Sequence, residues 1–278
     1  MKIINPFWEK TIKEHELSLN THGFENFKRY LNDNYFNWSW EWKFFFRKQM
    51  RFLLAHTSPV TWLRALREIG KRERWGRSDS RLFKFATRLV WEYARKHDAL
   101  GIMKFEEPSL GNPLPVTYNG RIISQDLANT SLELNWAITE KPNKVLELGA
   151  GYGRNAYAML KLYPNIEYTI ADIEPTISIS KKYLTTLFPN AQLKFISPLE
   201  LSKIPDNYTD FTFSISTLPE FTDEATKFYL KQFDRISGKM IYLKQWTKYF
   251  TYNFFSNLVK KEVCPIQTNF TQALWKQK

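Results

Sequence analysis

The C-terminal half of the chain alternates short apolar runs with longer amphipathic stretches. The apolar runs have the length of strands and lie at 144–148, 167–172, 192–196, 210–216 and 239–244. Stretches with helical periodicity separate several of them, at 154–162, 176–188 and 223–236. Regular alternation of this kind predicts βαβ units, and therefore a parallel sheet with helices on both faces.

The first 100 residues have a different pattern, because they are rich in aromatic and basic residues and poor in Gly and Pro. Over 44–95, apolar side chains recur at roughly helical spacing, which predicts several amphipathic helices. Ser58-Pro59 is a suitable start for one of these helices, and Gly70 or Gly76 is a suitable end.

The segment 108–120 consists largely of turn-forming residues. Within it, Asn119-Gly120 favours a tight turn, and Ser124 just beyond is placed to cap a helix that runs to about Ile138. We therefore expect three parts in chain order. They are a helical N-terminal domain at 1–107, a bridging segment with a pocket-lining helix at 108–140, and an α/β domain at 141–278.

The charge of the chain is strongly basic, with 40 Lys and Arg against 28 Asp and Glu and a formal net charge of +12. This balance favours encounter with polyanions such as nucleic acid, anionic lipid or phosphorylated carriers. Cys264 is the only cysteine, which excludes an internal disulfide and suits a reducing cytoplasm. No secretory signal and no apolar stretch of ~18 residues is found. We expect a cytoplasmic protein, at most peripheral on the inner face of the membrane.

A glycine-rich loop follows the first predicted strand, where residues 147–153 read Glu-Leu-Gly-Ala-Gly-Tyr-Gly. Glycine lets the backbone turn there and lets a ligand approach without a Cβ in the way. A dinucleotide fingerprint has the spacing Gly-x-Gly-x-x-Gly, whereas here the third glycine comes one residue earlier. That spacing, with an acid two positions before the first glycine, is typical of S-adenosylmethionine loops. The expected cofactor contacts in the loop are Glu147, for the cofactor's amino-acid end, with Gly149, Ala150, Gly151 and Gly153.

An acidic residue, Asp172, ends the second predicted strand and is followed by Ile173. A carboxylate at this position can accept both ribose hydroxyls of a nucleoside, and Ile173 is expected beside it. Taken alone, Asp172 could instead cap the next helix. Order and spacing together favour S-adenosylmethionine as the cofactor. Leu199, after the third strand, stands where the adenine contact is usual, although a plain loop is an open alternative. Ser216 and Thr217 end the fourth strand, and we expect them to contact cofactor and acceptor, respectively.

Several longer runs resemble one family in particular, the sugar O-methyltransferases encoded in bacterial surface-polysaccharide gene clusters. The matching runs are Glu147–Arg154, Ile215–Phe221 and Ile241–Trp246, with Gly111–Pro113, Ile123–Asn129 and Glu133 upstream. The resemblance covers roughly residues 108–246. It implies a Rossmann-like class I methyltransferase sheet and transfer of a methyl group from S-adenosylmethionine to a hydroxyl of a glycan or of a lipid-linked or nucleotide-linked precursor. One departure stands out: the family pattern often has a His after the fourth strand, where this chain has Pro219.

Methyl transfer to a hydroxyl is helped by a general base and by correct positioning of the acceptor. Glu220 is the first choice for the base, the alternative being a surface Glu near the helix from residue 223. Asp126, Asn129 and Glu133 share one face of a predicted helix. This face could line the acceptor pocket, with Asp126 and Glu133 as catalytic groups and Asn129 as a binding group. The alternative is an exposed polar face. Lys244 and Trp246 end the fifth strand and are expected to bind the acceptor; a buried core Trp is the alternative.

The remaining expectations concern metals and partners. No cluster of Asp, Glu or His suggests a metal site.

Residues 43–96 contain 15 Lys and Arg against 4 acids, and Trp38, Trp40 and Trp42 precede them. This region could meet an anionic membrane or lipid-linked substrate, bind nucleic acid, or form its own core with a solvated basic surface. Nucleic acid is disfavoured as an acceptor, because Ser216–Phe221 does not fit the Asn/Asp-Pro-Pro-aromatic motif of amino-methylating DNA enzymes. A cofactor-binding partner protein without chemistry remains an alternative.

Overall fold

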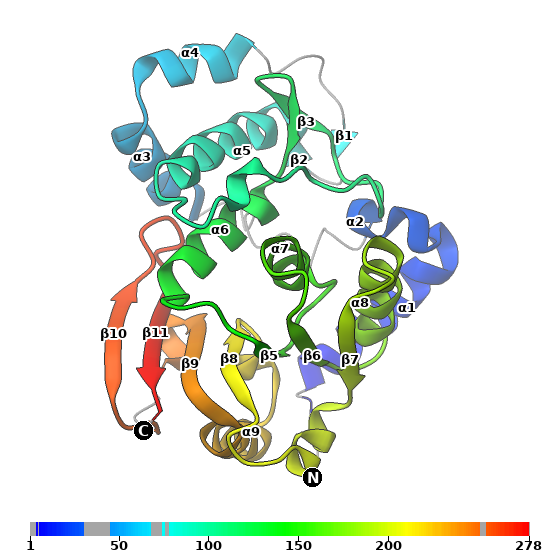
Figure 1. The fold of residues 1–278 in the computed structure, drawn as a ribbon. Coiled ribbons are helices and arrows are strands. Elements are labelled where there is room, and N and C mark those ends of the chain that lie inside the picture. The colour runs from blue at the N-terminus through cyan, green and yellow to red at the C-terminus, as the bar shows by residue number, and fades with distance from the viewer. Residues whose placement is uncertain are drawn as a thin grey trace. The chain divides into compact units, whose positions relative to one another are not determined.

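The computed structural model describes residues 4, 6–30, 45–67, 74–75, 78–250 and 254–277. Its chain forms two compact units, drawn together in Figure 1. Unit 1 comprises Met1–Glu16 and Glu140–Lys278, and unit 2 comprises Leu17–Thr139. The expected division at 107 and 140 into three consecutive domains stays a prediction.

Unit 1 is built on a seven-stranded sheet with the order β10-β11-β9-β8-β5-β6-β7. The strands are β5 (Lys144–Leu148), β6 (Glu167–Ala171), β7 (Gln192–Ile196), β8 (Thr209–Ile215), β9 (Ser237–Trp246), β10 (Leu258–Val263) and β11 (Phe270–Lys276). The strands from β5 to β9 pair in parallel, while β11 runs antiparallel to both of its neighbours. A parallel doubly wound sheet with one reversed strand inserted beside the last parallel strand is the Rossmann-like class I methyltransferase arrangement. The expected fold class is therefore confirmed.

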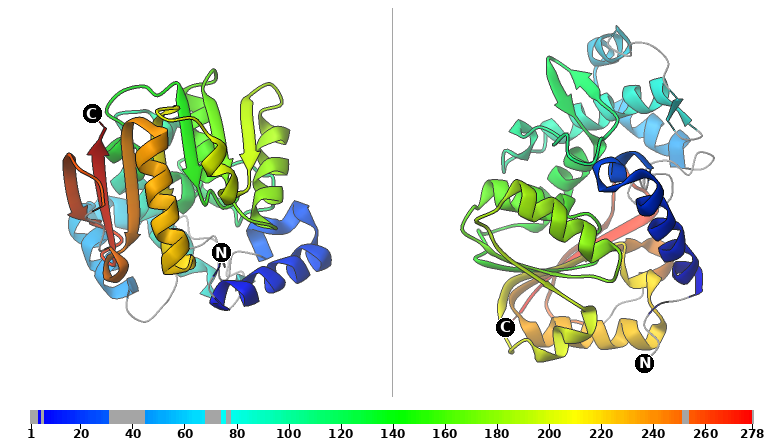
Figure 2. Two further views of the ribbon diagram at one scale, coloured as in Figure 1. Left: turned by 90° about the horizontal axis from the view of Figure 1, so that it is seen from below. Right: turned by 90° about the vertical axis from the view of Figure 1, so that its right-hand side faces the viewer.

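Helices cover both faces of this sheet (Figure 2, right). They are α7 (Arg154–Leu162), α8 (Thr176–Leu187) and α9 (Asp223–Ile236), with short 3-10 turns η4 (Pro198–Lys203), η5 (Leu218–Glu220) and η6 (Thr247–Tyr249). Buried side chains of α9, among them Tyr229 and Phe233, pack in one hydrophobic cluster with Leu146, Leu148 and Leu243 of the sheet. After β5, the chain adds β6 and β7 on one side of this strand and then returns to add β8 on its other side. The place where the direction of strand addition reverses is the switch point of the sheet, and α/β sheets bind ligands in the crevice there.

Unit 2 is mainly helical, in line with the expected N-terminal region. Its elements are η1 (Phe24–Asn26), α2 (Phe27–Tyr30), α3 (Phe45–His56), α4 (Pro59–Arg67), β1 (Arg74–Trp75), β2 (Ser78–Asp79), α5 (Ser80–Arg95), η3 (Ile102–Lys104), β3 (Val116–Tyr118), β4 (Arg121–Ile123) and α6 (Gln125–Ala137). The helices expected over 44–95 are thus present as α3, α4 and α5. Trp38, Trp40, Trp42, Gly70 and Gly76 lie outside the described residues.

Two local predictions for 108–140 are confirmed. Asn119 and Gly120 both have positive φ, 51° and 74°, and connect β3 to β4 as the expected tight turn. Ser124 is the N-cap of α6, because its hydroxyl accepts a hydrogen bond from the Leu127 N–H at 3.1 Å.

The N-terminal segment belongs in part to the sheet unit. Ile4 forms an isolated antiparallel bridge with Phe221, directly after Glu220, and α1 (Pro6–His22) follows. Unit 1 therefore contains one histidine, His15, whereas the sequence from residue 100 onward contains none. Burial lowers the pKa of His15 to about 4, so this imidazole is neutral at physiological pH. None of the described helices is long and apolar enough to cross a membrane.

A buried ion pair holds unit 2 together at the start of α6. Lys28 Nζ of α2 lies 2.5 Å from Glu107 Oε1, and both side chains are almost completely buried. The second carboxylate oxygen of Glu107 accepts a hydrogen bond from Ser124 Oγ at 2.6 Å. One carboxylate thus joins three segments that are far apart in the sequence.

Removing this charge is expected to destabilise the fold. Glu107→Gln leaves the buried ammonium of Lys28 without a counter-charge, so the free energy of unfolding should fall by about 3–5 kcal/mol. Glu106→Gln is the matched control, since the Glu106 side chain is 64% exposed and its ion pair with Arg121 spans 3.8 Å. It should change stability by less than about 1 kcal/mol. Denaturant titration followed by circular dichroism measures both, and equal losses would contradict this role for Glu107.

Candidate functional site

The glycine loop of unit 1 connects the carboxyl end of β5 to the start of α7. Gly149 and Gly153 have φ of 76° and 94°, a region that favours glycine. A Cβ on Gly149 would lie 2.0 Å from Oγ1 of Thr217, the second residue after β8. Thr217 Oγ1 in turn donates to the Gly149 carbonyl at 3.3 Å. The loop therefore lies against the end of β8, at the switch point of the sheet.

Asp172 fastens the same loop from the other side, at the end of β6. Its Oδ2 accepts the Gly151 N–H at 3.1 Å and its Oδ1 accepts the Ile173 N–H at 2.8 Å. The residue is only 6% exposed. Burial, and to a smaller extent the negative charge of Glu147, raises the pKa of Asp172 to about 7, although the backbone donors at Ile173 and Gly151 act in the opposite direction.

The chemistry of Asp172 fits a nucleoside with two free hydroxyls. An ionised carboxylate has about four acceptor positions, and the two backbone hydrogen bonds described above occupy one on each oxygen. The Ala150 backbone N–H also donates to this carboxylate, and the acceptor positions that remain can receive hydroxyl donors such as those of a ribose diol. The expected cofactor contacts at Asp172, Ile173 and the loop are thus neighbours in space.

Glu147 is placed beneath the loop and not at its surface. Its side chain is 1% exposed, Oε1 accepts from Asn155 Nδ2 at 3.0 Å, and Oε2 accepts from Tyr168 OH at 2.7 Å. These bonds join β5 to α7 and to β6. Burial, and next the Glu147 charge, raises the pKa of Tyr168 well above its usual value, so its hydroxyl remains a donor. Contact between Glu147 and a cofactor's amino-acid end stays a prediction, and the supporting pair Asn155 and Tyr168 was missed.

The end of β8 contributes Ser216, Thr217 and Glu220. Ser216 has a positive φ of 62°, and its N–H donates to the Lys244 carbonyl at 2.7 Å. Its buried Oγ has no hydrogen-bond partner among the described residues. Glu220, on η5, has its pKa raised well above the usual value by burial and by the charge of Asp172. No hydrogen bond or ion pair engages the Glu220 carboxylate within the described part of the chain.

Asp172, which follows β6, and Glu220, on η5 after β8, are close enough for the charge of Asp172 to raise the pKa of Glu220. Two neighbouring buried carboxyl groups raise each other's pKa, because their negative charges repel. A cation bound beside them would lower both pKa values. The arrangement can therefore do two things: accept hydroxyl hydrogen bonds at Asp172 and hold or release a proton at Glu220. No three His, Cys, Asp or Glu side chains in the described part of the chain form a group that could hold a metal ion.

At the end of β9, the predicted acceptor-binding residues face the C-terminal hairpin. Lys244 Nζ donates to Gln267 Oε1 and lies 5.6 Å from the centre of the Phe270 ring. Trp246 packs on the same ring, with centroids 4.8 Å apart. Their role in binding an acceptor stays a prediction.

Gln245, between Lys244 and Trp246, points to the opposite face of the sheet and was not singled out from the sequence. It is completely buried, its Nε2 donates to the Ser214 carbonyl at 3.2 Å, and its Oε1 has no partner among the described residues. Ser216 directly follows β8, whose last pair with β9 is Ile215 with Lys244. Gln245 is thus fully buried and has an acceptor oxygen without a partner among the described residues. The sequence pattern of Ile241–Trp246 alone does not reveal this.

Two predictions concern elements away from these contacts. Leu199 lies on η4, after β7, and is 44% exposed. Asp126, Asn129 and Glu133 all lie on α6, where their spacing places them along one side; Glu133 is 2% exposed. Because α6 belongs to unit 2, the roles of these three residues stay predictions.

Comparison with known proteins gives only distant similarities. No protein-family model matches the sequence, and no curated protein matches it significantly. Among solved structures, the PH0226 protein of Pyrococcus horikoshii OT3 aligns with 13% identity and a TM-score of 0.46, over 56% of this chain and 92% of that protein. An O-methyltransferase family protein of Burkholderia thailandensis aligns with 10% identity and a TM-score of 0.42, over 55% of this chain and 58% of that one. The YcgJ protein of Bacillus subtilis aligns with 17% identity and a TM-score of 0.36, over 42% of this chain and 50% of that one. The chain therefore spans 58% of the length of the Burkholderia protein and 50% of the length of the Bacillus protein.

The close approach of Gly149 to Thr217 leads to a stability prediction. Gly149→Ala adds a Cβ that would lie 2.0 Å from Thr217 Oγ1, at a residue whose φ is +76°. Gly120→Ala is a matched control, because its φ is +74° but nothing lies within 4 Å of its added Cβ. Backbone strain of about 1–2 kcal/mol is expected for both, with an additional loss for Gly149→Ala only. Thermal melting of the two variants measures the difference, and equal melting temperatures would contradict the close approach.

Proposed function

We propose that the chain is an S-adenosylmethionine-dependent methyltransferase. The observation that carries the proposal is the bonding of Asp172, at the end of β6, to the glycine loop that follows β5, on a sheet of the class I methyltransferase order. When bound, the cofactor would supply a transferable methyl group on a positively charged sulfur. The residues proposed to hold it are Asp172 at the ribose, the loop from Gly149 to Gly153, Ile173 and Leu199 at the adenine, and Ser216.

The positive charge of the cofactor's sulfur is compatible with the three acidic residues near the proposed site. Electrostatic interactions link Glu147 to Asp172 and Asp172 to Glu220, although the chain as a whole carries a net charge of +12. Like charges in a buried place raise one another's pKa, and a cation relieves this repulsion. The acidic edge therefore favours a sulfonium cofactor over a dinucleotide, whose pyrophosphate is negative.

For the acceptor, we propose a hydroxyl group of a glycan or of a lipid-linked or nucleotide-linked glycan precursor in surface polysaccharide synthesis. The support is the resemblance of Ile215–Phe221 and Ile241–Trp246 to sugar O-methyltransferases. Glu220 is the proposed base: it is half-buried and lies within electrostatic reach of Asp172. Its raised pKa favours the protonated acid, and a bound cation would favour the ionised form that a base requires.

Cofactor affinity is expected to depend on pH through Asp172. The pKa of this carboxyl is raised to about 7. Hydroxyl donors stabilise the carboxylate and not the acid, so binding lowers this pKa. Affinity should be highest above pH 7 and should fall by up to about tenfold per pH unit below it. Titration calorimetry with S-adenosylhomocysteine at several pH values measures this slope.

The same titration with Asp172→Asn tests the residue. Affinity at pH 8 should fall roughly 10- to 100-fold, because one acceptor oxygen becomes an amide NH2 and the other loses its charge, and the pH dependence should disappear. Asp210→Asn is the matched control: Asp210 Oδ2 also accepts two backbone N–H groups, from Asn143 at 2.8 Å and Lys144 at 3.1 Å, at the opposite end of β5. Unchanged affinity in Asp172→Asn would mean that the ribose does not bind at β6.

Transfer itself is tested with methyl-labelled cofactor and the host's surface glycans and their precursors. Label should appear on a sugar oxygen, and Glu220→Gln should slow transfer by about 10²–10⁴-fold with little change in cofactor affinity. Glu224→Gln, an exposed substitution in the first turn of α9, should leave the rate unchanged. Label in nucleic acid would assign a different acceptor, and cofactor binding without transfer to any acceptor would assign a partner protein without chemistry.

A further inference from the structure

One surface of unit 2 combines exposed apolar side chains with positive charge. On α4, Val60, Leu63 and Leu66 are 64%, 60% and 52% exposed, respectively. Their spacing of three residues places them along one side of the helix. Large aliphatic side chains exposed in a row, in contrast to single ones, indicate a surface that contacts another partner.

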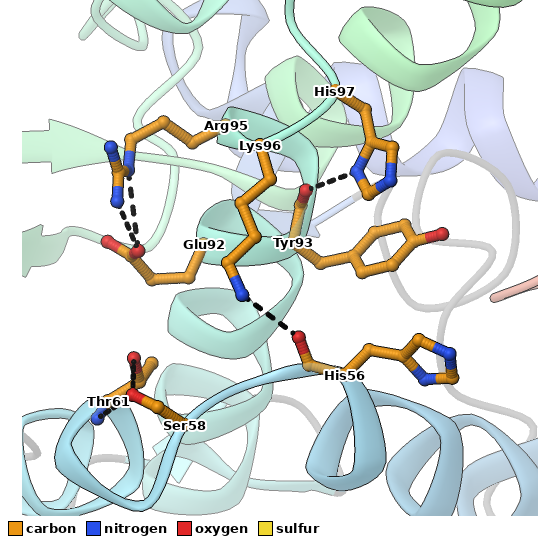
Figure 3. Close-up of polar contacts among 8 residues, drawn as sticks. All are labelled: His56, Ser58, Thr61, Glu92, Tyr93, Arg95, Lys96 and His97. Atoms are coloured by element: carbon orange, nitrogen blue, oxygen red, sulfur yellow. Dashed lines mark hydrogen bonds and ion pairs between the residues drawn. The ribbon is translucent and has the colours of Figure 1, made fainter.

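The opposite side of α4 is fixed to its own unit. Ala65 is completely buried, and Trp62 Nε1 donates to Thr57 Oγ1 at 2.8 Å. The segment that leads into α4 is bonded to the helices beside it (Figure 3). There, Lys96 Nζ of the α5 end donates to the His56 carbonyl at 3.1 Å, and Ser58 Oγ accepts the Thr61 N–H at 3.2 Å. The apolar row is therefore held outward by contacts on the other face.

On the described residues of α3, α4 and α5, the exposed charged side chains are all positive. Arg64 and Arg67 of α4 are exposed beside the aliphatic residues, and neither has an ion-pair partner among the described residues. Helices α3, α4 and α5 together contain nine Lys and Arg and one acid, Glu92. Lys84 and Arg88 are buried, whereas Lys48, Arg51 and Arg81 are exposed, as are the two arginines of α4. That acid is buried and bonded to Arg95 at 2.9 Å, also drawn in Figure 3. A protein partner would have to offer many acids, whereas an anionic membrane offers both negative charge and an apolar layer.

We propose that the outer face of α4, formed by Val60, Leu63, Arg64, Leu66 and Arg67, docks on an anionic phospholipid surface. The aliphatic side chains enter the boundary between headgroups and acyl chains, and the two guanidinium groups remain among the phosphates. Since α4 has nine residues, it lies along the surface and does not span the bilayer. This docking does not depend on the proposed function of unit 1.

The test uses the full chain and vesicles of phosphatidylglycerol mixed with phosphatidylcholine, compared with phosphatidylcholine alone. Co-sedimentation should show binding to the anionic vesicles that weakens as salt is raised. Leu63→Gln with Leu66→Gln should weaken binding by about tenfold or more, and Arg64→Gln with Arg67→Gln by about fivefold per charge. Leu258→Gln with Val259→Gln is the matched control, because these β10 residues are 53% and 52% exposed, and binding should be unchanged.

All of these positions are exposed, so the variants should keep the melting temperature of the parent, which separates lost docking from lost folding. Absence of binding to anionic vesicles would overturn the proposal, as would binding that the α4 variants leave intact. A self-association that the leucine variants abolish in sedimentation would assign the face to a second copy of the chain instead. Salt-sensitive binding to nucleic acid that needs the arginines but not the leucines would also overturn it.

Discussion

The hydrogen bonds between the Asp172 carboxylate and the backbone of the glycine loop organise the candidate site. A buried carboxylate is costly unless donors surround it, and the N–H groups of Gly151 and Ile173 supply them. These bonds keep the loop after β5 next to the end of β6, while Thr217 holds the same loop against β8. Burial nevertheless raises the pKa of Asp172 to about 7. The carboxylate that positions the loop therefore gains or loses its proton near neutral pH.

Beneath this layer, Glu147 supports the loop without needing to reach its surface. It joins β5 to α7 through Asn155 and to β6 through Tyr168. With Glu220 at the end of β8, three strands of the switch point each bring an acid to the same edge of the sheet. These acids lie together in a chain whose net charge is +12, whereas α3, α4 and α5 of unit 2 contain nine Lys and Arg against one acid.

Much of the sheet was predictable because its signals are local. The bounds of β5 and α9 agree with the apolar run at 144–148 and the helical period at 223–236. Strands β10 and β11 were missed: β11 is buried along most of its length and β10 is largely exposed, so neither shows the alternation that marks a half-buried strand. In the site, spacing located Asp172 and the loop, but it could not show that Glu147 points to Tyr168 or that Gln245 is buried, because those facts depend on contacts between distant segments.

Titration calorimetry of the unaltered chain tests the central claim most directly, with S-adenosylhomocysteine and NADH titrated separately at pH 8. The loop and acid arrangement predicts one binding site per chain for S-adenosylhomocysteine and no measurable binding of NADH, whose pyrophosphate would meet the acidic edge. Heat released by NADH but not by S-adenosylhomocysteine, or by neither ligand, would contradict the account.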